Sequence, residues 1–185
     1  MSGSAQAFNK LLDVAVNARR TAKGLPSQLD IKPHWSGIGF TLLGQKFVAP
    51  MGEVTEMLEL PAYTELPGVQ GWMRGLANVR GRLLPLTDLA AYLGSKLEAP
   101  RRNRRVLVVE SGEMYSGLIV DGILGMQHFP VDSYVSEMAA VDFPAMVPYL
   151  QGSFREEGDR GWTVFSPWLV VQDEKFFQVA VQASA

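Results

Sequence analysis

The sequence predicts a mainly β protein built from two small barrels, and three observations lead to this fold class. Short segments alternate apolar with polar residues, glycine-containing turns separate them, and the order hairpin, connector, hairpin, short helix occurs once in each half of the chain. Short antiparallel strands with glycine-rich turns favour small barrels over a sandwich. Hydrophobic residues make up 47% of the 185 residues and charged residues 19%, a composition typical of a folded domain.

The chain begins with a segment that has helical rather than strand periodicity. Four apolar residues recur at the spacing of one helix face: Phe8, Leu11, Leu12 and Ala15. We therefore predict an amphipathic helix over residues 4–22, ended by Gly24 and Pro26. With a connector, this makes residues 1–33 an N-terminal extension of the folded domain, which is expected over 34–182.

The first lobe is expected over about residues 36–98, and it opens with a hairpin. Ile38–Leu42 alternate as one strand, and Phe47–Met51 return as the other. Residues 52–60 are ambiguous, because their apolar residues have helical spacing in a stretch that is short for a helix.

A second hairpin is expected with Leu76–Arg80 and Leu83–Leu86 as its strands. Gly81 at the first position of the turn suits a type II′ turn, because glycine adopts positive φ without a steric cost. Pro85 cannot donate a ladder hydrogen bond, so the returning strand is expected at a sheet edge or a bulge.

The second lobe is expected over about residues 99–172, followed by a C-terminal strand or tail over 173–185. Its strands form two further predicted hairpins: 106–110 with 114–120, and 149–154 with 162–166. Each lobe ends in a predicted short helix. Thr87 or Asp88 caps the first, whereas Ser166 caps the second and Pro167 is its first residue.

No motif in the sequence indicates catalysis or a metal site. Cysteine is absent, and His34 and His128 lie far apart without a neighbour at ligand spacing. Nucleophile-elbow, zinc-protease and P-loop motifs are absent, and GIGFTLLG (37–44) only begins like a dinucleotide-binding motif before it leads into a strand. We expect no enzyme, cofactor or metal. An unrecognised hydrolase, which would need polar groups converging in a deep pocket, is the alternative.

Charge and hydropathy limit the partners. The formal net charge of −2 gives no general attraction to nucleic acid or anionic membranes. The run RRNRR at 101–105 is typical of a solvated loop that also discourages edge-to-edge pairing of strands. It has no interleaved aromatic residues, so contact with an acidic protein face is favoured over nucleic-acid binding. Neither a signal peptide nor an apolar run of membrane-spanning length is visible, so we expect a cytoplasmic protein without direct membrane insertion.

Four segments together carry a resemblance to a known family. They are GEVTEML (52–58), VQGWMRGLANVRGRLLPLTDLAAYLG (69–94), GLIVDGILGM (117–126) and YLQGSF (149–154). In this order they resemble the sequence pattern of CheW-type chemotaxis adaptors. The resemblance implies two SH3-like, five-stranded β-barrel lobes packed together, without catalysis or a cofactor. It also implies that the protein couples the signalling tip of a methyl-accepting chemotaxis receptor to the regulatory domain of a CheA-type histidine kinase.

Further segments are most similar to the adaptors of chemosensory systems that control type IV pili and twitching motility. They are GIGFTLLGQKFVAPMGEVTEM, LANVRGRLLPLTDL, GMQHFPVD and WTVFSPWLV. Such an adaptor is expected to be recruited to receptor arrays at the inner membrane. Two features depart from the family pattern: Ser166 and Pro167 stand where many members have Leu-Asp, and the N-terminal extension is added. A generic SH3-like peptide-binding module outside chemosensing is the alternative.

The resemblance also implies roles for individual residues, and it suggests that Arg80 pairs with Glu56 beside a receptor groove. The receptor-groove candidates are Val54, Glu56, Gly75, Leu76, Val79, Arg80, Ile123, Leu124 and Met126. The kinase-interface candidates are Met51, Met57 and Leu58. The residues expected to shape turns or cap backbones are Gly81, Asp88, Asp121 and Gly122. Ordinary core packing is the alternative role of the apolar candidates.

Overall fold

The computed structural model describes residues 33–137, 142–155 and 161–181, so the helix predicted over 4–22 lies outside the described residues. The strands of the unit that begins at His34 are β1 (His34–Leu42), β2 (Gln45–Pro50), β3 (Glu56–Glu59), β4 (Met73–Val79), β5 (Arg82–Asp88), β6 (Arg105–Ser111), β7 (Met114–Val120), β8 (Gly122–Pro130), β9 (Tyr134–Val135), β10 (Leu150–Phe154) and β11 (Trp162–Phe165). Its helices are α2 (Leu89–Tyr92), α3 (Pro167–Gln172) and α4 (Glu174–Phe177), with the 3-10 turns η1 (Met51–Glu53), η2 (Arg101–Asn103), η3 (Val131–Ser133) and η4 (Pro144–Tyr149). Within the described ranges, every helix is too short or too polar to cross a membrane.

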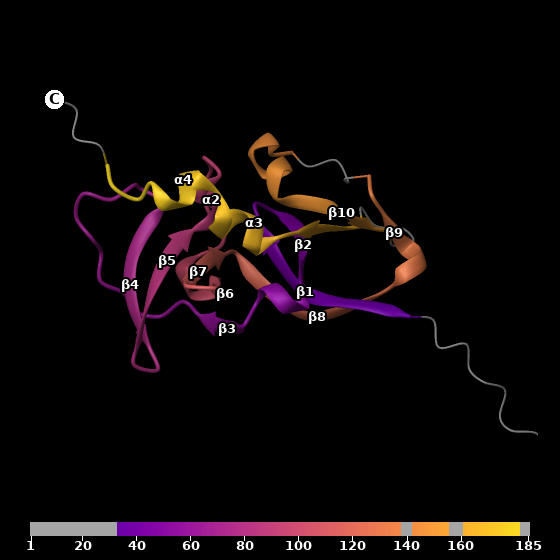
Figure 1. Ribbon diagram of the computed structural model, residues 1–185, viewed down its shortest axis with the longest axis horizontal. Helices are drawn as coiled ribbons and strands as arrows, with labels where there is room; N and C mark the ends of the chain where they lie inside the picture. Colours follow the sequence, from indigo (N-terminus) through magenta and orange to yellow (C-terminus); the bar gives the residue numbers. More distant parts are fainter. Residues whose placement is uncertain (1–32, 138–141, 156–160, 182–185) are drawn as a thin grey trace, which may run out of the picture. The chain divides into compact units, whose positions relative to one another are not determined.

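The strands form two sheets, which Figure 1 shows as two groups. The six-stranded sheet has the order β8-β1-β2-β11-β10-β9, and the five-stranded sheet has the order β3-β6-β7-β5-β4. Neighbouring strands are antiparallel except for β2 with β11 and β5 with β7, which are parallel. The predicted mainly β fold in two lobes is confirmed.

The sheets do not follow the predicted lobes at 36–98 and 99–172, and this division is wrong for the strands. β1 and β2 pair with β8 and β11 from the second half, whereas β3, β4 and β5 share a sheet with β6 and β7. Pairings between strands so distant in sequence leave no local pattern. The strand or tail predicted over 173–185 begins instead with α4, and Ala180 forms an isolated bridge with Val69.

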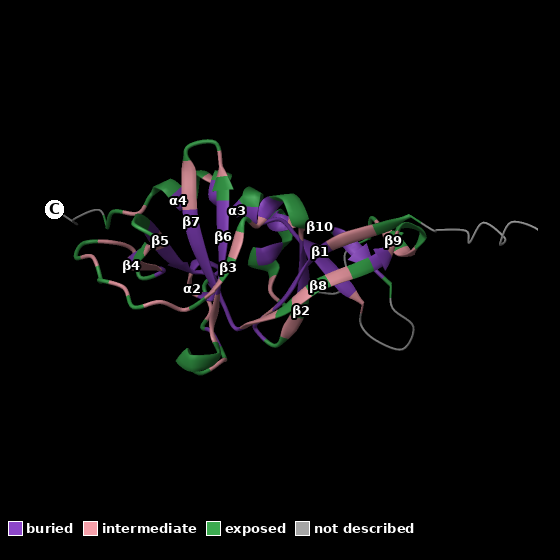
Figure 2. Ribbon diagram, turned by 90° about the horizontal axis from the view of Figure 1, so that it is seen from below, coloured by how far each residue is buried: buried purple, intermediate pink, exposed green. Residues whose placement is uncertain are grey.

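The buried apolar side chains form two hydrophobic cores, of which the main one joins the two sheets. The main core takes buried side chains from both sheets and from helices, such as Phe40 of β1, Leu86 of β5 and Val170 of α3. Figure 2 shows how buried residues dominate β5, β6 and β7. A second, aromatic core gathers against the six-stranded sheet and consists of Val48, Phe129, Phe154, Trp162 and Val164. Because neighbouring residues of β2 enter different cores, this strand is buried on both faces of the six-stranded sheet.

The glycines of GIGFTLLG make room for two tryptophan rings. A Cβ atom on Gly37 would lie 2.7 Å from the Trp35 ring, and a Cβ atom on Gly39 would lie 2.9 Å from the Trp162 ring. Trp162 belongs to the aromatic core, and Trp35 packs against it. The segment that begins like a dinucleotide-binding motif therefore serves aromatic packing within a strand.

The two hairpins β1–β2 and β4–β5 turn through residues with positive φ. Leu43 and Gly44 have φ of 52° and 72°, and Arg80 and Gly81 have φ of 51° and 81°. Positive φ at both central positions defines a type I′ turn. The predicted type II′ turn at Gly81-Arg82 is therefore wrong: the pairing of Val79 with Arg82 starts the turn one residue earlier, and Arg80 takes the left-handed conformation.

β5 is an interior strand, so the sheet edge predicted from Pro85 is wrong. The alternative prediction, a bulge, agrees with the register shift of the β4–β5 pairing between Met73 and Gly75. β5 lies between β4 and β7, and its pairing with β7 begins only at Leu86. Towards β4, Pro85 lies opposite Leu76, which exchanges its backbone hydrogen bonds with Thr64 instead. Proline is tolerated here because neither neighbour needs an N–H donor from this position.

Two further stretches differ from the sequence expectation. The ambiguous residues 52–60 contain the end of η1 and then β3. β8 occupies a stretch where the sequence predicts no strand, since Gly122 and Gly125 weaken its alternation. It pairs with β1 as an edge strand, and a Cβ atom on Gly122 would lie 3.1 Å from Thr41 Oγ1.

Candidate functional site

The hairpin of β4 and β5 reaches β3, although β3 and β4 are opposite edges of the five-stranded sheet. Arg80 Nη2 lies 2.6 Å from Glu56 Oε1. An ion pair between the two edges requires the sheet to curve round on itself, as in a small barrel. Asn78 fixes the turn, since its Oδ1 accepts a hydrogen bond from the Gly81 N–H at 2.9 Å. We call this pair the Arg80–Glu56 brace.

The receptor-groove candidates near the brace differ in exposure. Val54 and Val79 are half-buried and pack against the main core. Leu76 is half-buried, and its backbone bonds Thr64. Gly75 is buried with φ 138°, and a Cβ atom there would collide with the Thr64 carbonyl oxygen. Gly75 therefore acts through close backbone packing and offers no side chain to a partner.

The remaining receptor-groove candidates lie on β8, a free edge of the six-stranded sheet. Ile123 is half-buried and packs against the main core, whereas Leu124 and Met126 are exposed. In both ribbon views β3 and β8 lie beside the junction of the two groups of strands (Figures 1 and 2). The structure thus places the candidates in two sets, one on each sheet.

The kinase-interface candidates are divided between surface and core. Met51 of η1 and Met57 of β3 are exposed. Leu58 is half-buried and packs against the main core, because successive residues of a strand point to opposite faces. Only Met51 and Met57, of these three, offer an exposed side chain to a partner.

Two aspartates hold backbone N–H groups. Asp88 is the N-cap of α2 and accepts a hydrogen bond from the Ala91 N–H at 3.0 Å. The buried Asp121 accepts hydrogen bonds from the Leu43 N–H at 2.8 Å and the Ala99 N–H at 2.7 Å. Asp121 therefore ties the β1–β2 turn to the segment that follows α2.

A buried carboxylate that the sequence does not indicate lies at the N-terminus of α3. Glu53 is 7% exposed, and its Oε2 accepts hydrogen bonds from the Ser166 hydroxyl at 2.7 Å and the Trp168 N–H at 3.0 Å. Ser166 is the N-cap of α3, and its hydroxyl accepts a hydrogen bond from the Leu169 N–H at 3.3 Å. The Ser-Pro start predicted for this helix is confirmed. The hydrogen bonds from the start of α3 to Glu53 join residues far apart in sequence, so no local sequence pattern predicts them.

A chain of side-chain hydrogen bonds links α2, η4 and the N-cap of α4. The Tyr149 hydroxyl donates a hydrogen bond to Asp173 Oδ2 at 2.6 Å, and it lies 3.2 Å from the Tyr92 hydroxyl. Burial, followed by the bond to Asp173, raises the pKa of Tyr149. The same bond lowers the pKa of Asp173. Tyr149 thus stays protonated at neutral pH, and the bond is structural.

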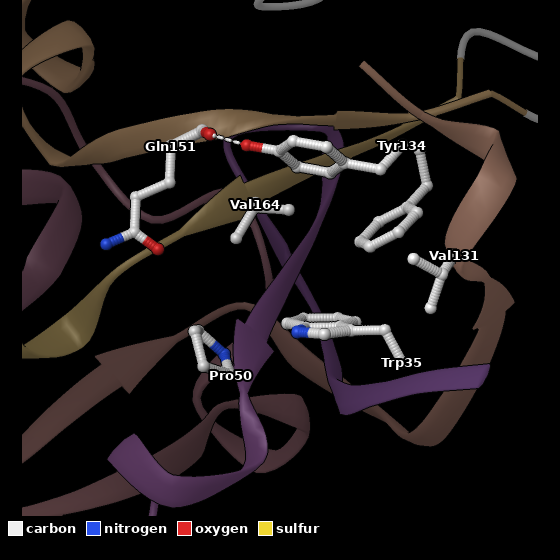
Figure 3. Close-up of a pocket in the computed structure, with 7 residues that line it drawn as sticks. Trp35, Pro50, Val131, Tyr134, Gln151 and Val164 are labelled. Atoms are coloured by element: carbon white, nitrogen blue, oxygen red, sulfur yellow. Dashed lines mark hydrogen bonds between the residues drawn. The ribbon is translucent and has the colours of Figure 1, made fainter. Parts of the chain in front are cut away.

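An aromatic pocket of about 320 Å³ opens on the six-stranded sheet (Figure 3). Its lining consists of Trp35, Pro50, Val131, Tyr134, Gln151, Phe154 and Val164. The Phe154 ring centroid lies 4.9 Å from that of Trp35 and 5.3 Å from that of Tyr134. The Tyr134 hydroxyl donates a hydrogen bond to the Gln151 carbonyl oxygen, which holds its ring at the wall. The pocket can receive an apolar side chain, and the sequence does not reveal it because its residues come from five strands and η3.

The two histidines, far apart in the sequence, lie on the paired strands β1 and β8, where His34 is opposite Pro130 and His128 is opposite Ser36. Both are exposed, and His128 Nδ1 lies 2.7 Å from Ser36 Oγ. Among the residues that the structure describes, His, Asp and Glu side chains do not gather in threes as they would around a metal ion.

These features describe a β domain that has exposed apolar side chains on edge strands, an ion-paired hairpin and an aromatic pocket. The chain belongs to the CheW-like domain family, whose sequence model matches residues 36–175. It is accordingly a CheW-like adaptor of a chemosensory system, and the resemblance found in its sequence is confirmed.

Individual relatives narrow the position within the family. The chain is 49% identical to Protein PilI of Pseudomonas aeruginosa, in an alignment that covers 98% of this chain and 100% of that protein. It is 26% identical to Chemotaxis protein CheW of Helicobacter pylori, over 61% of this chain and 68% of that protein. The crystal structure of the scaffolding protein TtCheW from Thermoanaerobacter tengcongensis aligns with a TM-score of 0.60 and 18% identity, covering 72% of this chain and 88% of that one. This last match shows a shared fold.

Proposed function

We propose that this protein couples the signalling tip of a methyl-accepting chemotaxis receptor to the regulatory domain of a CheA-type histidine kinase, in a system that controls type IV pilus twitching motility. One observation carries the proposal: exposed apolar side chains occupy the edge strands β3 and β8 of two different sheets. A coupling protein needs two such surfaces. The full-length similarity to PilI supports the link to type IV pili.

In this proposal the receptor contacts the β8 side chains Leu124 and Met126 and the region of the Arg80–Glu56 brace. The kinase contacts Met51 and Met57, whose flexible thioether side chains suit a protein interface. The brace joins β3 to the β4–β5 hairpin. It therefore fixes the position of β3, which carries a kinase candidate, relative to the hairpin, which carries receptor candidates.

The same proposal makes the protein a non-catalytic member of a cytoplasmic array at the inner membrane, held there by its receptor. Neither a metal nor a cofactor has a part in it. Elemental analysis of the purified protein is expected to find zinc and iron far below one atom per chain, and a stoichiometric metal would contradict this view.

The aromatic pocket favours a second function, that of a peptide-binding module outside chemosensing. Trp35, Tyr134 and Phe154 provide the kind of ring-lined wall that proline-rich or apolar peptides occupy. A pull-down with tagged protein from the native lysate discriminates the two functions. Recovery of a chemotaxis receptor together with a CheA-type kinase supports coupling, whereas recovery of proline-rich proteins without either supports the module.

A further inference from the structure

A basic pocket of about 660 Å³ lies between the start of β4, α2 and the end of the arginine run. Its charged lining residues are Arg74, Asp88, Lys96 and Arg104, and Trp72 and Leu97 add buried apolar surface. The arginine run at 101–105 has no role in the proposed coupling of receptor and kinase. The structure places its Arg104 in this pocket.

The cations of the pocket form no ion pairs within the described part of the chain, although Asp88 and Glu65 attract Arg74 electrostatically. Arg80, Arg82 and Arg105 each have a carboxylate oxygen within 4.0 Å. Among the described residues, no carboxylate lies that close to Arg74, Lys96 or Arg104. The one carboxylate in the lining, that of Asp88, already accepts the hydrogen bond that caps α2. Three cations therefore face one engaged carboxylate.

Two of these cations are held in place by the fold. Arg104 Nε donates a hydrogen bond to the Ala99 carbonyl oxygen at 2.9 Å. Arg74 bonds the Tyr63 hydroxyl, which also accepts a hydrogen bond from Arg101 Nη1 at 3.2 Å. Burial raises the pKa of Tyr63, but hydrogen bonds from Arg74 and Arg101 outweigh burial and lower it. A guanidinium group that is already oriented loses less entropy when it binds an anion.

We propose that this pocket binds an acidic segment of a partner protein, with Asp or Glu carboxylates contacting Arg74, Lys96 and Arg104. Guanidinium groups match carboxylates in a two-pronged geometry, and Trp72 and Leu97 can cover the aliphatic part of a Glu side chain. The net charge of −2 disfavours a long polyanion or an anionic membrane, which would meet the whole surface. The proposal goes beyond coupling of receptor and kinase and does not depend on it.

The test measures binding of a defined probe by the full-length chain. The probe is a fluorescein-labelled decapeptide of alternating Glu and Ser, followed by fluorescence anisotropy at low salt, and its Gln counterpart is the uncharged control. Lys96→Glu is compared with Arg102→Glu, because both residues are exposed and both changes alter the net charge equally. Only Lys96 lines the pocket. Neither side chain makes a hydrogen bond or ion pair in the described structure that would couple its loss to folding.

We expect Lys96→Glu to weaken binding of the Glu peptide by about tenfold or more, and Arg102→Glu by less than about threefold. The Gln peptide should not bind. Equal losses in the two variants would show a diffuse charge effect and overturn the pocket. A labelled oligothymidine or phosphatidylserine vesicles serve as the phosphate probes. If either bound more tightly than the Glu peptide with the same sensitivity to Lys96→Glu, the ligand would be a phosphate and the proposed protein partner would be wrong.

Discussion

Replacing Arg80 by Ala should uncouple receptor control and leave the protein folded. The Arg80 side chain is 79% exposed and that of Glu56 is 24% exposed. Because solvent screens such a pair, its loss should lower the free energy of unfolding by at most about 1 kcal/mol. For a chain of this size that corresponds to a fall in melting temperature of roughly 2–4 °C. Assembly should be more sensitive, since the brace positions two edges of the sheet together.

Two further variants help to separate the effect of losing the ion pair from other effects of a change in this hairpin. Arg80→Gly also removes the pair, but glycine relieves the positive φ of 51° at a gain of about 1 kcal/mol. It should therefore match or exceed the melting temperature of Arg80→Ala and still fail to assemble. Arg82→Ala is the control, because Arg82 lies on the same hairpin and pairs with Glu110 of β6 at 3.1 Å instead of with β3.

The assay is co-assembly of the variant with receptor and kinase, measured beside thermal melting and twitching motility. If Arg80→Ala assembles and supports motility like the wild type, the brace has no part in signalling. A fall in melting temperature well above about 4 °C would instead mean that Arg80 stabilises the fold. If the pair acts as one unit, the double variant Glu56→Ala/Arg80→Ala should be no worse than either single variant.

Three further predictions concern buried contacts and pH. Glu53→Ala should cost about 2–4 kcal/mol, because it leaves the Ser166 hydroxyl and a backbone N–H without their acceptor; thermal melting measures the loss, and Glu53→Gln should lose less. Asp121→Ala should cost about 3 kcal/mol or more, since two backbone N–H groups lose a charged acceptor, and an unchanged urea midpoint would contradict this role. Asp173 has a lowered pKa in the folded state, so its stabilisation is present above its ordinary value of 3.8 and lost as the pH falls below it. The gap in melting temperature between wild type and Tyr149→Phe should therefore narrow below about pH 4, and a constant gap would refute the linkage.

Local features of the fold were predictable from the sequence. The paired strands of the first hairpin, the N-caps at Asp88 and Ser166 and the proline at the start of α3 follow from short-range chemistry that alternation and capping rules capture. The exact turn was not predictable, because Arg80 in a left-handed conformation contradicts the preference of a type I′ turn for Asn or Gly.

The remaining features depend on contacts between distant residues. The parallel pairing of β2 with β11 and the anchor of α3 on Glu53 have no pattern within any short window of sequence. Some of the site residues that the sequence indicated have no exposed side chain in the structure. Gly75 has no side chain to offer, and Leu58 packs against the main core. The aromatic pocket escaped prediction because its walls come from many separate segments.

Coupling of a receptor to a kinase by this protein is tested most directly when the protein is omitted from a reconstituted system. Purified receptor in vesicles, CheA-type kinase and this protein are combined, and kinase autophosphorylation is measured with and without receptor ligand. We expect receptor ligand to change the kinase rate only when this protein is present, and we expect Arg82→Ala to restore the response but Arg80→Ala not to restore it. A receptor-dependent change of the same size without this protein would show that it is not the coupling component.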